Sequence, residues 1–272
     1  MLKFLLWNLN KKPLQDSIER LARKHEVDVI VLLENTIPPD VILRILNPLG
    51  TADYYYSRDL SCEKVHIFSR FIDIYIKSIQ VVSNCCTIRH LMLPARTDII
   101  LTAVHFPSKK NWREDSQIIE CTNLSEDIAK VERQIGHTRT VLMGDLNMNH
   151  FEPGVVSAKG LHATMSQRIA RKKSRKVQSR EYPFFYNPMW NLFGNGATGP
   201  SGTYYYNNAE HKVFFWNMFD QVLLRPDLVD VFKDENLKIL ETDGRESFLN
   251  KHGIPDKTNF SDHLPVLFSL DI

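Results

Sequence analysis

The chain lacks the features that mark secreted, zinc-finger and membrane proteins. It has four cysteines in 272 residues and no C-x-x-C pair, which argues against a disulfide framework and against a cysteine-based zinc site. No apolar run approaches the roughly 20 residues of a membrane helix. The apolar start at residues 2–6 stops too early for a signal peptide, so it predicts a buried first strand. These absences favour a cytoplasmic protein with reduced thiols.

A net charge of one sign is also missing. Lys and Arg total 34 against 32 Asp and Glu, so the formal charge is +2 and predicts no class of partner. The chain is instead rich in apolar residues, at 43%, which is enough to bury a sizeable core. It shows no internal repeat and no proline- or serine-rich linker. We therefore expect residues 1–272 to form a single domain, with a basic and aromatic insertion around residues 160–215.

Apolar runs and helical patterns alternate along the chain. Largely apolar runs at residues 2–6 and 27–33 predict strands covered on both faces, with a helical pattern between them. Residues 112–135 also predict a helix. Further strands are expected at residues 65–68, 72–76, 87–93, 99–104, 140–143, 218–224 and 266–270. This order predicts an α/β fold, a two-sheet sandwich of mixed β-sheets flanked by outer helices.

Polar side chains follow these strands at the points where the strands end. Asn8 and Glu34 close the first two strands, and a strand–helix–strand unit brings such exits to the same edge. Carboxylate and amide oxygens suit Mg²⁺, with Mn²⁺ as a substitute, and a histidine beside a carboxylate can act as a base or hold a phosphate. Phosphoryl transfer needs this kind of charge neutralisation. His105, Asp145 and Asn147 follow other predicted strands, and Asp262 and His263 lie just before the last one, at residues 266–270.

Each of these residues has a structural explanation when it is taken alone. Asn8 suits a turn, Glu34 an exposed loop, and Asp145 the cap of a turn. A lone histidine such as His105 is more often structural than catalytic. Asp220 is harder to explain in this way, because it lies within an apolar stretch and a buried carboxylate is costly unless it is paired. The joint pattern favours a site.

Six short segments resemble the motifs of the endonuclease/exonuclease/phosphatase superfamily, which has the deoxyribonuclease-like fold. They occur in the order of that family and extend from near the start of the chain to near its end. The resemblance implies a four-layer α/β sandwich and a metal-dependent phosphoesterase, and it says much less about the substrate. The segments are Trp7-Asn8, Leu33-Glu34-Asn35, Val104-His105-Phe106-Pro107-Ser108, Gly144-Asp145-Leu146-Asn147, Phe219-Asp220-Gln221-Val222 and Ser261-Asp262-His263.

The resemblance also implies a role for each residue. Glu34 would be the principal Mg²⁺ ligand, with Asn8 supporting the metal or the phosphate and Asp262 serving metal binding. Asp145 would orient or deprotonate the attacking water. Asn147 would hydrogen-bond the phosphate oxygens.

The histidines have implied roles as well. His263 would be the base or a clamp on the phosphate, and Asp220 would fix the orientation of its ring. His105 occupies the position at which the deoxyribonuclease branch has a second histidine, where the abasic-site endonuclease branch uses a tyrosine. Glu63 is expected to be the carboxylate partner of His105.

Two segments between Asn147 and Asp220 are expected to overhang the site. Residues 168–180 are densely basic and suit a nucleic-acid backbone, with a solvated loop as the structural alternative. Residues 182–206 are rich in aromatics that can stack on bases, with a small core beneath a long loop as the alternative. If residues 204–206 are extended, neighbouring tyrosines point to opposite faces. The basic residues proposed for nucleic-acid binding are Arg171, Lys172, Lys173, Arg175 and Lys176.

The sequence therefore predicts a Mg²⁺-dependent phosphodiester hydrolase, with a nuclease acting on DNA in preference to RNA as the first hypothesis. The same site would serve a phosphatase or phosphodiesterase acting on a small phosphoester or a lipid headgroup, because a fold does not settle a substrate. A non-catalytic binding module is the third alternative, and the complete set of site residues argues against it.

Overall fold

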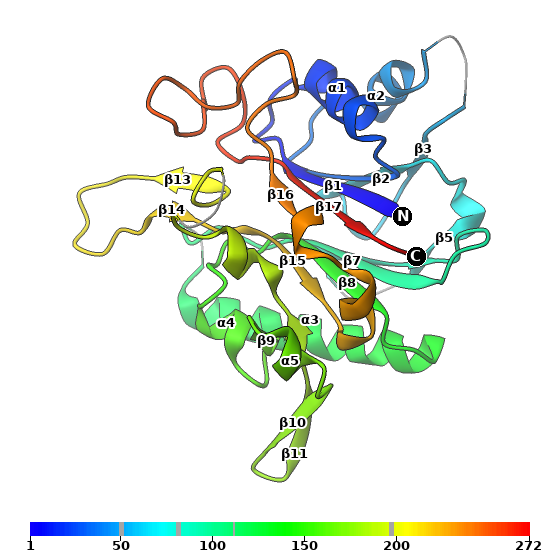
Figure 1. Ribbon diagram of the computed structural model, residues 1–272, viewed down its shortest axis with the longest axis vertical. Coiled ribbons are helices and arrows are strands. Elements are labelled where there is room, and N and C mark those ends of the chain that lie inside the picture. Colours follow the sequence, from blue (N-terminus) through cyan, green and yellow to red (C-terminus); the bar gives the residue numbers. More distant parts are fainter. Residues whose placement is uncertain (49–51, 80–82, 111, 196–198) are drawn as a thin grey trace.

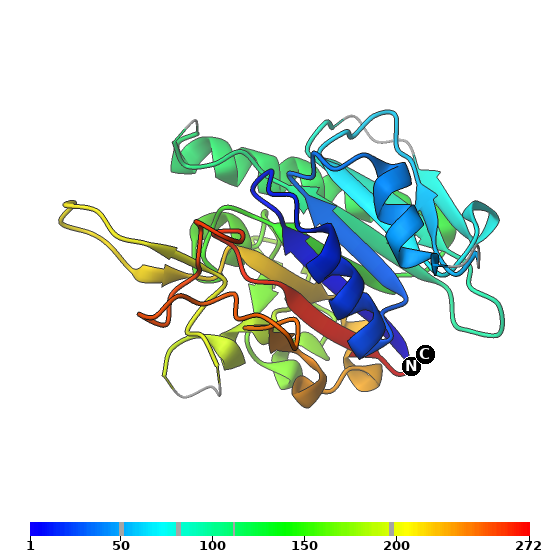
Figure 2. The same ribbon diagram turned by 90° about the horizontal axis from the view of Figure 1, so that it is seen from above.

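Two β-sheets lie face to face, and helices cover their outer faces (Figures 1 and 2). The computed structural model describes residues 1–48, 52–79, 83–110, 112–195 and 199–272. The arrangement confirms the predicted α/β sandwich of mixed sheets. No helix within the described residues has the length and apolar character needed to cross a membrane.

The six-stranded sheet contains both ends of the chain. Its order is β16–β17–β1–β2–β4–β3, and β1 pairs with β2 in parallel while the other pairs are antiparallel. The parallel pair is the predicted strand–helix–strand unit, so the two strands end at the same edge. The strands are β1 (Leu2–Asn8), β2 (Val29–Leu33), β3 (Tyr55–Ser57), β4 (Val65–Ser69), β16 (Lys238–Ile239) and β17 (Val266–Leu270).

The seven-stranded sheet comes mainly from the middle of the chain. Its order is β5–β6–β7–β8–β15–β12–β9, with β7 and β8 parallel at its centre and β15 antiparallel to β8. The strands are β5 (Ile76–Ile79), β6 (Cys86–Leu91), β7 (Ile99–His105), β8 (Thr140–Asp145), β9 (Ala163–Thr164), β12 (Phe185–Tyr186) and β15 (Asp220–Leu224).

The helices explain why the strands are apolar on both faces. One face of each sheet packs on the other sheet, where the rings of Phe4 and Phe268 stack with centroids 4.7 Å apart. The opposite faces pack on helices, through residues such as Leu21 of α1 and Ile128 of α3. The helices are α1 (Gln15–His25), α2 (Pro39–Leu46), α3 (Glu114–Ile135), α4 (Pro153–Val156) and α5 (Gln167–Ala170).

Two antiparallel hairpins lie outside the main sheets. The first, β10 (Ser174–Val177) with β11 (Arg180–Pro183), projects at the bottom of Figure 1. The second, β13 (Tyr204–Tyr206) with β14 (Phe215–Asn217), extends to one side. Short 3₁₀ helices connect other elements: η2 (Asp73–Tyr75), η3 (Pro188–Leu192), η4 (Pro226–Val231) and η5 (Asp234–Asn236).

One predicted strand is wrong. Residues 72–76 were expected to be extended, but η2 occupies most of this stretch and β5 begins only at Ile76. Ile72 and Ile74 are exposed, so their apolar character does not report a buried strand. The other predicted strands each overlap an observed one, and the helix expected over residues 112–135 is α3.

Candidate active site

The site is built around Asp145, the last residue of β8. In the seven-stranded sheet, Asp145 pairs with His105 at the end of the parallel strand β7 and with Asp220 at the start of β15. This register places three predicted site residues side by side. Asp145 is only 1% exposed, so its carboxylate lies at the bottom of the site.

Gly144 allows the two central strands to approach each other. Its φ is +155°, and a Cβ at this position would lie 1.9 Å from the carbonyl oxygen of Val104. A side chain at residue 144 would therefore push β7 and β8 apart, directly beside Asp145. The glycine is required by close backbone contact.

The carboxylate of Asp145 accepts three hydrogen bonds. Asn8 donates from Nδ2 to Oδ2 at 3.0 Å, which links the two sheets. Asn147 donates from its backbone to Oδ1 at 2.8 Å and from Nδ2 to Oδ2 at 3.2 Å. Asn147 has a φ of +50° and also donates to the carbonyl of Phe106, so its position is fixed from two sides. Because donors bond to both of its oxygens, the carboxylate of Asp145 is fixed in one orientation, and these bonds favour its ionised form.

His263 lies opposite, paired with Asp220. The ring Nδ1 of His263 is 2.7 Å from Oδ2 of Asp220, and both residues are buried. The indole of Trp7 donates to the carbonyl of His263, and the Oγ of Ser261 accepts from its backbone amide. The ring of Tyr204 covers the imidazole at a centroid distance of 4.7 Å. This confirms the expectation that the buried Asp220 needs a partner.

The charges of these groups act on each other. Burial alone would lower the pKa of His263, but the carboxylate of Asp220, with Asp145 beyond it, outweighs burial and raises it to about 10. Burial raises the pKa of Asp145, Asp220 acts in the same direction, and the imidazoles of His263 and His105 oppose both. The imidazole is therefore cationic at neutral pH, beside a carboxylate held by donors.

Glu34 and His105 form a second histidine–carboxylate pair. Nε2 of His105 is 3.4 Å from Oε1 of Glu34 and 3.8 Å from Oδ2 of Asp145. The hydrogen bond from His105 lowers the pKa of Glu34, so Glu34 stays ionised. Glu34 follows β2 with a φ of +47°, which turns the chain at the strand exit.

The expected pairing of His105 with Glu63 is not formed. Glu63 is exposed, and Nδ1 of His105 is buried without a hydrogen-bond partner among the described residues. Val65 of β4 pairs with Leu33, so Glu63 reaches the same end of the sheet, but one strand farther from β1. Glu34 holds the position that Glu63 was expected to take.

The oxygen donors of the site fit a hard divalent cation. Glu34, Asp145 and Asp262 line one cleft, and Oδ1 of Asp262 is buried without a hydrogen-bond partner among the described residues. Mg²⁺ prefers such carboxylate oxygens. Asn8 is less available, because its Oδ1 accepts from the amide of Asn10 and its Nδ2 donates to Asp145. Asn8 is placed to support the site through Asp145.

Another group of metal-capable side chains lies at the same place. The ligand atoms of Asp145, Asp220 and His263 are within 4.8 Å of one another. The Nδ1 of His263 is already bonded to Asp220. This group is therefore a hydrogen-bonded cluster, which leaves Glu34 and Asp262 as the carboxylates best suited to hold an ion.

Comparison with protein families decides the identity of the fold. The model of the endonuclease/exonuclease/phosphatase family matches residues 5–263, nearly the whole chain. The chain belongs to this family. It is therefore a phosphoesterase hydrolase, as the members of the endonuclease/exonuclease/phosphatase family are. The match spans all six motifs found in the sequence.

Solved structures of the family have the same fold. A family protein from Leptotrichia buccalis has a TM-score of 0.59 at 15% identity, over 100% of both chains. The catalytic domain of human Nocturnin with bound sulfate has a TM-score of 0.58 at 13% identity, over 99% of this chain and 94% of that one. An AP endonuclease from Archaeoglobus fulgidus has a TM-score of 0.58 at 12% identity, over 100% of both. Curated protein sequences give no match.

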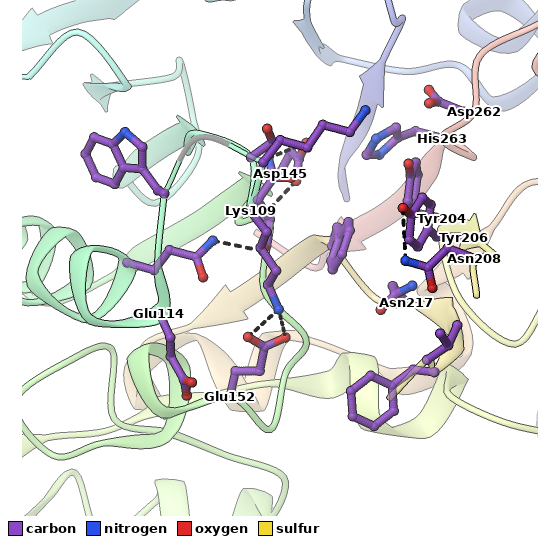
Figure 3. A pocket seen from close by; sticks show the side chains of 18 of the residues that line it. Lys109, Glu114, Asp145, Glu152, Tyr204, Tyr206, Asn208, Asn217, Asp262 and His263 are labelled. Carbon is purple, nitrogen blue, oxygen red and sulfur yellow. Dashed lines mark hydrogen bonds and ion pairs between the residues drawn. The ribbon is translucent and has the colours of Figure 1, made fainter. Parts of the chain in front are cut away.

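The candidate site opens into a cleft of about 910 Å³ (Figure 3). Tyr204 and Tyr206 of β13 line the cleft, while the ring of Tyr205 contacts Trp216 at a centroid distance of 5.4 Å. This bears out the expectation that the three tyrosines alternate between two faces. The sequence did not identify the loop that follows His105, which also lines the cleft.

That loop carries an ion pair at the cleft. Lys109 donates to both carboxylate oxygens of Glu152, and its ammonium lies 5.8 Å from the centroid of the Phe219 ring (Figure 3). Lys109 follows the family motif that ends at Ser108, so its place in the sequence was an available signal. Glu152 follows no strand, and only the fold brings it to Lys109.

The basic segment does not overhang the site. None of its proposed nucleic-acid-binding residues lines the cleft. Residues 171–173 follow α5, and residues 174–183 form the separate hairpin β10–β11 (Figure 1). Arg171 is paired with Asp230, and Lys173 with Asp227. The N–H at Nε of Arg175 bonds to the ring of His162. Lys172 and Lys176 are exposed, and neither forms an ion pair within the described residues.

Proposed function

We propose that the chain is a Mg²⁺-dependent phosphodiester hydrolase that cleaves DNA by attack of a water molecule on phosphorus. The observation that carries this proposal is the placement of Asp145 between two histidine–carboxylate pairs. His263 with Asp220 lies on one side, and His105 with Glu34 on the other. Such a site can manage a proton and a phosphate charge together.

Asp145 would accept the proton of the attacking water. Its oxygens are buried and oriented by Asn8 and Asn147, so the carboxylate does not have to reorganise during the reaction. Burial raises its pKa, which makes it a better base than an exposed aspartate. Asn147 would also hydrogen-bond the phosphate oxygens once substrate is present.

His263 would hold the phosphate as a cation. Asp220 bonds to Nδ1, so Nε2 is the nitrogen left for the substrate. With a pKa of about 10, the ring is protonated at neutral pH and suits the role of phosphate clamp better than that of base. The negative charge that grows as the P–O bond breaks would be stabilised there.

Glu34 and Asp262 would hold Mg²⁺, with Mn²⁺ as a substitute. A bound divalent cation supplies charge neutralisation to the reacting phosphate. His105 would keep Glu34 ionised and oriented, since its Nε2 lies 3.4 Å from the carboxylate.

DNA is proposed as the substrate, in preference to a small phosphoester. The cleft continues well beyond Asp145 and is lined by cations and aromatic rings, and an AP endonuclease is among the structures of similar fold. We propose that the basic hairpin, defined as β10–β11 together with the basic residues 171–173 that precede it, contacts the backbone of DNA that extends past the cleft. Its proposed contact residues are Arg171, Lys172, Lys173, Arg175 and Lys176.

The test is cleavage of supercoiled plasmid with Mg²⁺, with Mn²⁺ and with a chelator. Wild-type protein should nick the plasmid only with metal, and His263→Ala and Asp145→Asn should each lose at least 100-fold in rate. His90→Ala is the matched control, since His90 also pairs with a carboxylate, Asp98, but does not line the cleft. Retained activity in His263→Ala would contradict the assigned roles.

Plasmid and linear DNA that stay intact while a small phosphoester is hydrolysed would overturn the choice of substrate. A panel of phosphorylated compounds, including lipid headgroups, would then identify the alternative. Loss of activity in His90→Ala together with His263→Ala would indicate a folding defect, which thermal unfolding of each variant would show directly.

A further inference from the structure

The outer part of the cleft has two walls of similar character. One wall is the connection between β7 and α3, which contributes Lys110, Trp112 and Arg113. The other is the hairpin β13–β14, which contributes Tyr206 and, from its connecting segment, residues 208 and 212–214. Figure 3 shows the hairpin side chains facing the cleft across from Lys109. Each wall combines cations with aromatic rings.

The aromatic rings of the hairpin are unusually exposed. Tyr206 is 42% exposed and Phe214 is 45% exposed, although both are large enough to be buried in a core. The ring of Phe214 contacts Phe151 with a centroid distance of 5.2 Å and leaves its remaining surface open to the cleft. Exposed rings on a groove wall are typical of a surface that a ligand covers.

Three cations of the outer cleft have no acidic partner among the described residues. Within the residues that the structure places, Lys110, Arg113 and Lys212 form no ion pair with a carboxylate. Lys109 differs, because it is bonded to Glu152. The ammonium of Lys212 lies 5.6 Å from the centroid of Phe214, so a cation and a ring are presented together. Cations beside exposed rings match a polymer with alternating phosphates and bases.

We propose that this cleft binds single-stranded nucleic acid, and that the enzyme acts on unpaired strands in preference to duplex. Bases stack on Tyr206 and Phe214, and phosphates lie against Lys110, Arg113 and Lys212. A duplex hides the faces of its bases inside the stack, so the rings of the hairpin can stack only on bases that are unpaired. The inference rests on the proposed function for its claim that the bound strand is the substrate.

Binding can be measured without catalysis. Fluorescence anisotropy of a labelled 20-nucleotide oligothymidylate, and of a duplex of equal length, is followed with wild-type protein in a chelator. The single strand should bind at least 10-fold more tightly than the duplex. Phe214→Ala and Tyr206→Ala should each weaken single-strand binding by roughly 5- to 100-fold, the range found for base–aromatic stacking.

Phe215→Ala is the matched control. Phe215 is the next residue on the hairpin and is also exposed, at 48%, but it does not line the cleft and faces Tyr205 instead. The Phe215→Ala variant should bind the single strand as tightly as the wild-type protein does. Lys212→Ala should weaken binding and reduce its dependence on salt, because one phosphate contact is lost. Thermal unfolding of each variant shows whether it is folded.

The outcomes separate this inference from the function on which it rests. Equal affinity for single strand and duplex, or equal effects of Phe214→Ala and Phe215→Ala, would overturn the single-strand inference even if plasmid is nicked. Absence of cleavage on every nucleic acid, with hydrolysis of a small phosphoester, would overturn the proposed function. Faster cleavage of an unpaired loop than of flanking duplex would support both.

Discussion

Two carboxylates lie next to each other in the site, and their surroundings give them different tasks. Asp145 receives hydrogen bonds from Asn8 and Asn147 at both of its oxygens. Asp220 bonds to His263 through one oxygen, and its other oxygen is buried without a partner among the described residues. Asp145 is therefore oriented so that its carboxylate can accept a proton at the cleft. Asp220 supplies the negative charge that balances the imidazolium of His263.

The two tasks predict different kinetic defects. Asp220→Asn removes the charge that raises the pKa of His263, so turnover should fall by roughly 10²- to 10⁴-fold without a change in the Mg²⁺ concentration that gives half-maximal rate. Glu34→Gln should instead raise that Mg²⁺ concentration by about 10- to 100-fold. Initial rates over a Mg²⁺ series measure both effects. The assigned roles would be reversed if the Mg²⁺ concentration for half-maximal rate changed in Asp220→Asn and stayed the same in Glu34→Gln.

At the scale of the elements, the approach of β7 to β8 depends on Gly144. Gly144→Ala should lower the free energy of unfolding by about 3 kcal/mol or more, because the new Cβ would meet the Val104 carbonyl. Gly136→Ala is the control. Gly136 also has a positive φ, +90°, but a Cβ there meets no atom within 4 Å. It should cost only about 1 kcal/mol. Urea unfolding compares the two, and equal losses would mean that backbone strain alone matters at residue 144.

Helix α1 is fastened to the loop that follows β16 by a buried carboxylate. Asp243 accepts hydrogen bonds from Ser17 and Arg20 of the helix and from the backbone of Arg245 and Glu246. Burial would raise the pKa of Asp243, but these donors outweigh it and lower it to about 2. The folded state therefore favours the ionised carboxylate.

This carboxylate makes stability depend on pH in one direction. The contribution of the ionised Asp243 to the free energy of unfolding is complete above the ordinary aspartate pKa of 3.8, and it is lost as the pH falls towards 2. Asp243→Asn should cost about 2 kcal/mol at pH 7, and the cost should shrink between pH 4 and pH 2.5. Urea unfolding at several pH values measures the difference. A difference independent of pH would show that the charge contributes nothing.

The strand exits could be predicted from the sequence, and the loops could not. Asn8, Glu34, His105 and Asp145 follow largely apolar runs, and the rule that parallel strands end at one edge brings Asn8 to Glu34. The packing of one sheet on the other, which brings this pair to His105 and Asp145, does not follow from that rule. The expected pairing of His105 with Glu63 was wrong, because Glu34, at the end of the strand nearer to β1, lies beside His105 instead. Glu152 was beyond reach, since its contact with Lys109 joins two loops.

At the scale of the whole molecule, the core between the sheets is shared by distant parts of the chain. Strand β17 near the end pairs with β1 at the start, and both pack on strands from the middle. We propose on this basis that residues 1–272 fold as one domain. The direction in which the insertion projects was not predictable, because a run of basic residues fixes no position on a surface.

The basic hairpin gives a prediction at the same scale. Lys172→Ala combined with Lys176→Ala leaves the ion pairs of Arg171 and Lys173 intact. It should weaken binding to a long DNA and lower the slope of log affinity against log salt by about 1 to 2. Binding of a six-nucleotide strand should not change. An equal loss on the short strand would place the hairpin at the cleft after all.

The meeting of the two chain ends has an engineering consequence. Leu2 pairs with Leu270, and the guanidinium of Arg96 donates to the carbonyls of both Met1 and Ile272. A short glycine–serine linker could therefore join the ends, and new ends could be opened at the exposed turn of β10–β11. The circular permutant would keep every side chain of the candidate site in place. It would also carry its new ends on the basic hairpin, so its affinity for long DNA would report whether the intact hairpin is needed.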